Sequence, residues 1–204
     1  MNTLLVSLLL TLGVCAGAQA ADLAGNAAAG QGKALVCGAC HGPDGNSPIG
    51  NFPKLAGQGE RYLLKQLQEI KGGKRTVPEM TGLLVPLNDQ DLADLAAWYA
   101  SQKGSVGAAN PALVARGEAL FRGGKLEDGM PACIGCHSPD GAGNAPAGYP
   151  RLSGQHADYI KKQLTAFREE ERVNDGDSMV MRSIAAKLSN KDIEALAQYI
   201  QGLH

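Results

Sequence analysis

Aromatic residues are scarce in this chain of 204 residues. They make up 4% of the sequence, as one Trp, five Tyr and three Phe, and alanine supplies much of the 44% hydrophobic share. Full burial of a large apolar side chain contributes roughly 1.5–3 kcal/mol, whereas alanine contributes much less. The composition therefore excludes an ordinary large single-core enzyme domain, and we expect the chain to pack around something besides its own side chains.

An excess of charge and a long hydrophobic run beyond the N-terminus are also missing. The 19 Lys and Arg nearly balance the 20 Asp and Glu, so no basic surplus favours a nucleic-acid partner and no acidic tail is present. After residue 20 no apolar stretch approaches the roughly 20 residues that a membrane span needs. No alternation of β-branched residues is long enough to predict a sheet.

The first twenty residues have the pattern of an export signal. They carry no charged side chain, Leu4 to Val14 is too short to cross a bilayer, and Ala18-Gln19-Ala20 suits a signal peptidase. We predict a signal peptide over residues 1–20, removed to leave Ala21 first, and a periplasmic location. The absence of a basic residue before the apolar run is a departure from the usual pattern. A lipid anchor on Cys15 is one alternative, disfavoured by the bulky residue before it. An uncleaved membrane anchor is another alternative.

The remainder of the chain contains one pattern written twice in the same order, which indicates a tandem duplication. The matching segments are residues 37–45 and 133–141, 52–58 and 149–155, and 87–92 and 188–193. The seam, Lys103 to Pro111, is rich in turn formers and lacks periodic apolar residues. We therefore predict an N-terminal domain over 21–103, a linker over 104–112 and a C-terminal domain over 113–204.

Both copies have helical periodicity. Apolar residues recur at i, i+4 and i+7 in each copy, at Leu63, Leu67 and Ile70 and again at Ile160, Leu164 and Phe167. The last apolar segment of each copy follows Asn88 or Ser189, each three residues before an Asp, which approximates a capping box. The sequence predicts an all-α fold of two tandem domains, each with three or more short helices.

Four of the five cysteines lie in two Cys-x-x-Cys-His segments, at Cys37, Cys40 and His41 and at Cys133, Cys136 and His137. This spacing places two thiols on one turn, where they can bond to the vinyl groups of one haem while the His binds its iron. Structural zinc and disulfides both leave the His without a role, and a dithiol redox motif would need a thioredoxin-like context that is not visible. We predict two covalently bound haems c.

Methionines are the candidates for the second axial ligand of each iron. Met80 and Met181 each lie seven residues before the leucine that opens the last matching segment, so the repeat selects Met181 over Met179, which stays open as the alternative. Met130 lies too close to Cys133 to reach the far face of a haem. His156 and His204 are not duplicated, which argues against two bis-His sites. A thioether opposite an imidazole favours Fe(II).

Two prolines are candidates for orienting the ligand histidines. Pro53 and Pro150 follow His41 and His137 at nearly equal spacing, and a carbonyl there could accept the ring Nδ1–H. A helix-breaking loop proline is an equally good reading of the spacing. Trp98 could donate a hydrogen bond to a haem propionate, although packing is its simpler role.

These residues resemble a known family, the dihaem class I cytochromes c of the cytochrome c4 type, over essentially the whole mature chain. The segments that carry the resemblance are Val36–Asn46, Phe52–Gln58, Gly123–Lys125, Ala132–Pro139 and Met181–Ser189. Residues 72–78 form a shorter segment than the family leads us to expect, a difference that bears on the exposure or potential of the first haem but should leave Met80 in place.

The resemblance implies two cytochrome c folds related by a pseudo-twofold axis, with axial ligands at His41, Met80, His137 and Met181. It also implies electron transfer from a quinol-oxidising cytochrome bc complex to a terminal oxidase, often of the cbb type, by a protein that is free or loosely attached to the inner membrane. We expect a monomer with no enzymatic activity. The alternatives are a dihaem peroxidase or thiosulfate-oxidising enzyme, for which no third Cys or duplicated spare His is present, and a tethered dehydrogenase subunit.

The scarcity of aromatic residues generates a prediction about folding. Halves this small are marginal on their own side chains, so we expect that neither half folds cooperatively without haem. Circular dichroism and denaturant unfolding of protein made without haem attachment would test this. A stable, native-like helix content in that protein would contradict it.

Overall fold

Short helices separated by loops make up the computed structural model, which describes residues 23–204. The predicted signal peptide and its cleavage site lie outside the described residues. The helices are α1 (Ala27–Lys33), α2 (Gly38–His41), α3 (Glu60–Lys71), α4 (Asp89–Ser101), α5 (Pro111–Gly123), α6 (Ile134–His137), α7 (Ala157–Arg168), α8 (Val180–Ala185) and α9 (Asn190–Gly202), with 3-10 turns at Pro78–Met80 and Leu126–Asp128. Within residues 23–204 the only β pairing is two isolated bridges, which confirms the all-α prediction.

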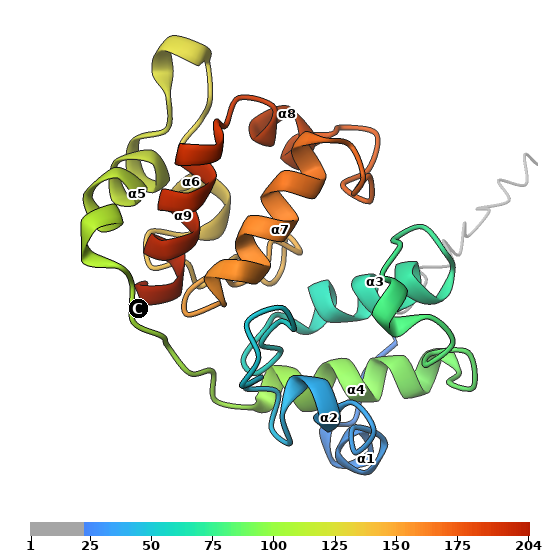
Figure 1. The fold of residues 1–204 in the computed structure, drawn as a ribbon. Helices are drawn as coiled ribbons and strands as arrows, with labels where there is room; N and C mark the ends of the chain where they lie inside the picture. Colours follow the sequence, from blue (N-terminus) through green and yellow to red (C-terminus); the bar gives the residue numbers. More distant parts are fainter. Residues whose placement is uncertain (1–22) are drawn as a thin grey trace, which may run out of the picture.

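The helices form two bodies joined by an extended segment (Figure 1). In the first body α1 and α3 pack on α4, and in the second α5 and α7 pack on α9, with α8 against α7. α5 begins at Pro111, inside the predicted linker, because Asn110 caps it and proline suits the first helical position. Among residues 23–204, no helix is both long and apolar enough to cross a membrane.

The final helix of each body begins with the predicted capping box. The Asn88 side chain accepts from Asp91 N at 2.9 Å while the Asp91 carboxylate accepts from Asn88 N at the same distance. Ser189 and Asp192 make the same reciprocal pair before α9. These caps fix where α4 and α9 start, and both helices bury most of their length in the cores.

A glycine permits the closest helix crossing in each body. A Cβ built on Gly30 would lie 2.0 Å from Asp94 O, and one on Gly117 would lie 2.3 Å from Ala195 O. Side chains are therefore excluded where α1 crosses α4 and where α5 crosses α9. Because the same close approach occurs twice, the duplication seen in the sequence extends to the packing.

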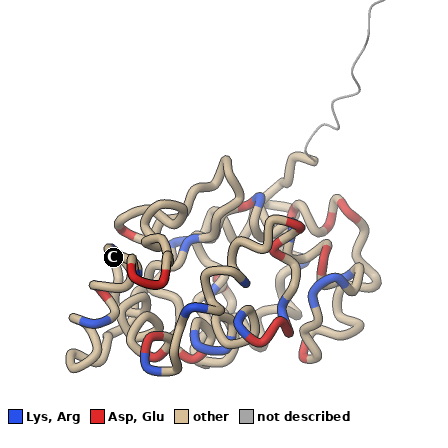
Figure 2. The backbone as a smooth tube through the Cα atoms, turned by 90° about the horizontal axis from the view of Figure 1, so that it is seen from above, with Lys and Arg blue, Asp and Glu red and all other residues tan. Residues whose placement is uncertain are grey.

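The second body has the more extensive core of side chains. Its buried cluster includes Phe121, Met130 and Ile193, whereas the buried cluster of the first body is mainly aliphatic and rests on Leu63, Leu95 and alanines. Lysine, arginine and acidic residues are interspersed over both bodies (Figure 2).

Reciprocal amide hydrogen bonds join the two bodies. The buried Gln58 side chain donates to Arg151 O at 2.9 Å and accepts from Arg151 N at 2.7 Å. Its repeat counterpart Gln155 donates to Lys54 O at 2.8 Å and accepts from Lys54 N at 2.9 Å. Each glutamine therefore pairs with the loop backbone of the opposite body, in a pseudo-twofold arrangement.

A second group of polar side chains follows the same symmetry. Arg75 donates to the hydroxyl of Tyr159 at 3.0 Å, and Arg172 donates to that of Tyr62 at 3.2 Å. Burial would raise the pKa of Tyr62, but the nearby charges of Arg172 and Arg75 outweigh it and lower that pKa. Each arginine also donates to a glutamine of its own body, Gln66 at 2.8 Å and Gln163 at 2.7 Å.

The helix crossings generate a stability prediction. Gly117→Ala should destabilise the haem-loaded protein by about 1–3 kcal/mol, because its methyl group must displace the α9 backbone. Gly123→Ala, in the same helix with open space around it, should be neutral or stabilise the helix by up to about 1 kcal/mol. Denaturant unfolding of both variants measures the difference. Equal effects would show that the crossing tolerates a side chain.

Candidate functional site

Each Cys-x-x-Cys-His segment forms a single helical turn. In both, the His N donates to the O of the first cysteine at 2.9 Å, from His41 to Cys37 and from His137 to Cys133. The cysteines at 37, 40, 133 and 136 form no disulfide with one another, and among residues 23–204 there is no cluster of three or more His, Cys, Asp or Glu that could hold a metal ion. The geometry gives no support to the disulfide or zinc interpretations.

The candidate ligand histidines are buried, and the ring Nδ1 of each lies within hydrogen-bond distance of a proline carbonyl. His41 Nδ1 lies 2.9 Å from Pro53 O, and His137 Nδ1 lies 2.9 Å from Pro150 O. Burial lowers the pKa of both imidazoles despite these carbonyls. A neutral ring that donates Nδ1–H to a carbonyl keeps the Nε2 lone pair for a metal.

An aromatic residue stands edge-on to each imidazole at matching positions. The Phe52 ring centroid is 6.3 Å from that of His41, and Tyr149 is 6.1 Å from His137. Both aromatic residues directly precede the orienting proline, so the same loop supplies the carbonyl and the aromatic ring beside each imidazole.

The environment of Cys37 and Cys133 does not favour a reactive thiolate. Burial raises the pKa of Cys37 and raises that of Cys133 to about 11. Reactive cysteines of disulfide oxidoreductases have lowered values instead. This environment disfavours the dithiol redox interpretation.

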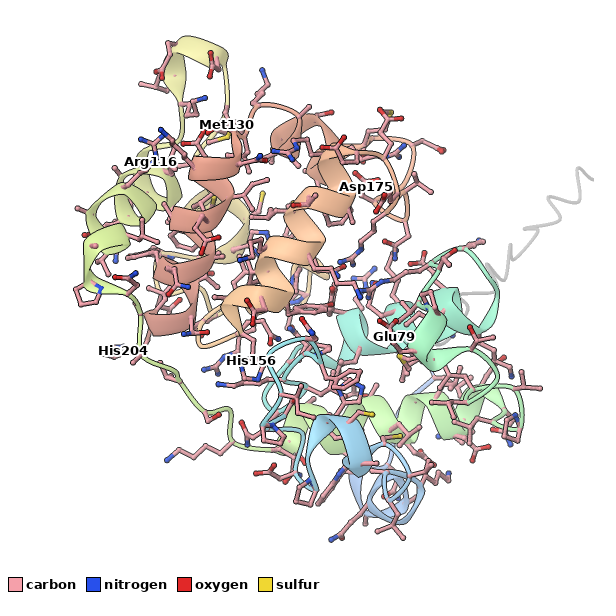
Figure 3. All side chains as sticks on the ribbon, viewed as in Figure 1. Glu79, Arg116, Met130, His156, Asp175 and His204 are labelled. Atoms are coloured by element: carbon pink, nitrogen blue, oxygen red, sulfur yellow. The ribbon has the colours of Figure 1, made fainter. Side chains whose placement is uncertain are left out.

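The structure separates the methionines by environment. Met80 ends a 3-10 turn and lines a cavity of about 300 Å³ with Ile70 and Leu84. Met181 is half-buried within α8. Met179 caps that helix, with φ of 49° and 38% of its surface exposed. Met130 is buried in the second core (Figure 3).

Unsatisfied buried donors in the first body fit a missing polar acceptor. Within residues 23–204, the buried side-chain polar atoms without a hydrogen-bond partner are Trp98 Nε1 and Tyr99 OH, both on α4. Buried polar groups normally have partners. Haem carries two carboxylates that accept such bonds, and the paired thiols, imidazoles and thioethers supply the donor set that a haem c requires. The residues present therefore fit the group.

Two histidines outside these turns lie elsewhere in the structure. His156 occupies the position before α7, and its Nε2 lies 2.8 Å from Ser47 O of the opposite body. His204 is exposed at the C-terminus, with its Nδ1 2.9 Å from Gly202 O. Both are labelled in Figure 3.

The sequence reasoning missed the polar contacts between the bodies. Arg75 and Arg172 occupy corresponding positions in the two repeats, as do the tyrosines and glutamines that they contact. The sequence shows that these residues occupy matching positions in the two repeats. Matching positions do not show that the two copies contact each other through them.

Known proteins match both halves. The cytochrome c family model matches residues 27–103 and 114–204. The chain is 72% identical to cytochrome c4 of Pseudomonas aeruginosa and 69% identical to that of Azotobacter vinelandii, each covering 100% of both chains. The chain belongs to the cytochrome c4 family. The crystal structure of reduced recombinant cytochrome c4 from Pseudomonas stutzeri matches with a TM-score of 0.88 and 69% identity, over 89% of this chain and 100% of that one.

Membership in the family decides the cofactor and the general role. Each half is a cytochrome c domain with one covalently bound haem c, and the protein is a dihaem electron carrier. The predictions of the family, of the fold and of two haems are thereby confirmed. The individual ligand residues stay predictions.

The choice between Met181 and Met179 can be tested by spectroscopy. Met181→Ala should remove about half of the red charge-transfer band of Fe(III)–Met in the oxidised protein, because one of the two irons loses its thioether. Met179→Ala is the matched control and should leave the band intact, since that side chain is exposed. The reverse result would assign the ligand to Met179.

Proposed function

We propose that the protein carries electrons in the periplasm between respiratory complexes, from a quinol-oxidising cytochrome bc complex towards a terminal oxidase of the cbb type. It is exported by residues 1–20 and works as a monomer, free or loosely associated with the inner membrane. The irons carry out no substrate chemistry. The two domains span residues 21–103 and 113–204.

The site residues follow the duplication. Cys37, Cys40, Cys133 and Cys136 would hold the two haems through thioether bonds, and His41 with Met80 and His137 with Met181 would bind the two irons. The bound haem supplies a one-electron Fe(III)/Fe(II) couple. A thioether opposite an imidazole raises the reduction potential relative to two imidazoles, which suits a carrier at the oxidising end of a chain.

The two matching sets of candidate iron ligands, one histidine and one methionine in each half, support this proposal. Each half has a buried imidazole fixed by a proline carbonyl 2.9 Å away and a half-buried methionine. Two protein ligands on each iron would leave no position open for a substrate, which supports electron transfer over a peroxidase or a thiosulfate-oxidising enzyme.

The chain's own contribution is to hold the ligands still. The Pro53 and Pro150 carbonyls accept the ring Nδ1–H and so fix the tautomer and the ring orientation. Because the ligand geometry is preset by these loops, little rearrangement is needed when the iron changes oxidation state. The short Cys-x-x-Cys-His turn adds a second fixed point for each haem.

Spectroscopy and partner kinetics test the proposal together. The oxidised protein should show two low-spin haems and no high-spin fraction, and the reduced protein should not bind carbon monoxide. Purified cytochrome bc complex with quinol should reduce it, and purified cbb-type oxidase should oxidise it, with turnover in the combined system that depends on the added protein.

Two results would contradict the proposal. A high-spin fraction at rest, or rapid carbon monoxide binding, would show an open iron and favour an enzyme. Failure of both purified complexes to exchange electrons with the intact dihaem protein would remove these complexes as its partners.

A further inference from the structure

A single peptide group lies between the candidate ligand histidine of the first body and a side chain of the second body. The Pro53 C=O lies 2.9 Å from His41 Nδ1. The N–H at the other end of the same peptide bond belongs to Lys54, and it donates to Gln155 Oε1 at 2.9 Å. Because the peptide unit is planar and its C–N bond is conjugated, the two hydrogen bonds are made by opposite ends of one rigid group.

The second body repeats this arrangement with the roles exchanged. The Pro150 C=O lies 2.9 Å from His137 Nδ1. The N–H across that peptide bond belongs to Arg151 and donates to Gln58 Oε1 of the first body at 2.7 Å. We call the peptide groups Pro53–Lys54 and Pro150–Arg151 the ligand peptides. Each glutamine is thus connected to the histidine of the opposite body through the ligand peptide of that body.

The partners of each glutamine fix which way its carboxamide points. Gln58 Oε1 also accepts from Gly59 N at 2.9 Å, and Gln155 Oε1 also accepts from His156 N at 3.0 Å. Two backbone N–H groups therefore converge on each oxygen, and a reversed carboxamide would place its NH₂ group against them. Gln58 is 8% exposed and Gln155 is 7% exposed, so water has little access to these bonds.

Hydrogen bonds in a chain polarise one another, most strongly in a buried, low-dielectric setting. A peptide N–H that donates makes the carbonyl oxygen of the same peptide more negative, so that oxygen becomes a better acceptor. A stronger bond from the histidine Nδ1–H makes the imidazole more basic and a better electron donor to a metal at Nε2. Such a ligand favours Fe(III) over Fe(II) and lowers the reduction potential.

We propose that Gln155 is a positioning residue for the first haem site and Gln58 for the second. Each acts through the ligand peptide of the opposite body, strengthens the bond between the histidine and the proline carbonyl there, and lowers the reduction potential of that iron. This rests on the proposed function, in which His41 and His137 bind the two irons. The reduction potential of each haem is therefore set in part by the other domain.

Methionine in place of each glutamine tests this, because it has a similar length and no comparable acceptor. Gln155→Met should increase the equilibrium constant for reduction of haem 1 about threefold, a rise of about 30 mV in a one-electron potential, and leave haem 2 nearly unchanged. Gln58→Met should do the reverse. Redox titration of the dihaem protein, followed by the haem methyl resonances of each domain, measures both potentials.

The Nδ1–H proton of His41 gives a second readout in the reduced, diamagnetic protein. Gln155→Met should move its resonance upfield and speed its exchange with solvent, because the bond to Pro53 O weakens. Gln155→Glu keeps an acceptor oxygen for Lys54 N–H and should keep the wild-type resonance or move it downfield. Its added charge lowers nearby potentials by itself, so only the proton resonance is read for this variant. An upfield shift in Gln155→Glu would overturn the proposal, even if the Met variants fail to fold.

Gln201→Met is the matched control in the second body. The Gln201 side chain accepts from Ala157 N at 2.9 Å and donates to Ala108 O at 2.6 Å, so these hydrogen bonds lie within the second body and the linker. The same substitution there should leave both potentials and both Nδ1–H resonances as in wild type. Changes as large as those in Gln155→Met would show a general effect of losing a buried amide and would overturn the proposal.

The crossed pattern of potentials decides the role of the glutamines. If each Met variant moves mainly the haem of the opposite body, the proposal holds. If each moves the haem of its own body, or both haems equally, the glutamines only join the bodies and the proposal is wrong. Failure of the proposed ligand set looks different: ring resonances of His41 and His137 that are not shifted by a haem in reduced wild type would overturn both proposals.

Discussion

The rest of the structure depends on one hydrogen bond that occurs twice, from a histidine Nδ1 to a proline carbonyl. It joins the turn that holds the cysteines to a loop 12 residues later at His41 and 13 residues later at His137. The imidazole is thereby a structural tie as well as a ligand, because it links two loops that share no helix or sheet. Around these ties the chain needs few aromatic residues of its own, since each haem supplies a large flat apolar body.

The two histidine–proline hydrogen bonds lie directly beside the contacts that join the two bodies. Pro53 and Pro150 stand next to Lys54 and Arg151, the residues whose backbones pair with Gln155 and Gln58 of the opposite body. A shift of one body against the other would break the amide pairing and pull on the loops that orient the ligand histidines. The interface and the ligand geometry are therefore mechanically connected through adjacent residues.

Much of this could be predicted from sequence because the signals are local or repeated. The Cys-x-x-Cys-His turns, the capping boxes at Asn88 and Ser189 and the helical periodicity each lie within a few residues. The contacts of His156 with Ser47 and of Arg75 with Tyr159 join segments far apart in the chain. Spacing within one segment carries no information about which segments meet, so these contacts needed the three-dimensional structure.

Gln58 and Gln155 each bond to the loop backbone of the opposite body, and this has a consequence for how the halves associate. Equivalent residues that contact each other's loops form an isologous interface, the kind found in twofold homodimers. Here both partners belong to one chain joined by a short segment, so the contact is intramolecular, with an effective concentration on the order of millimolar for a short linker. The pairing of the two haem domains is thus independent of how dilute the protein becomes.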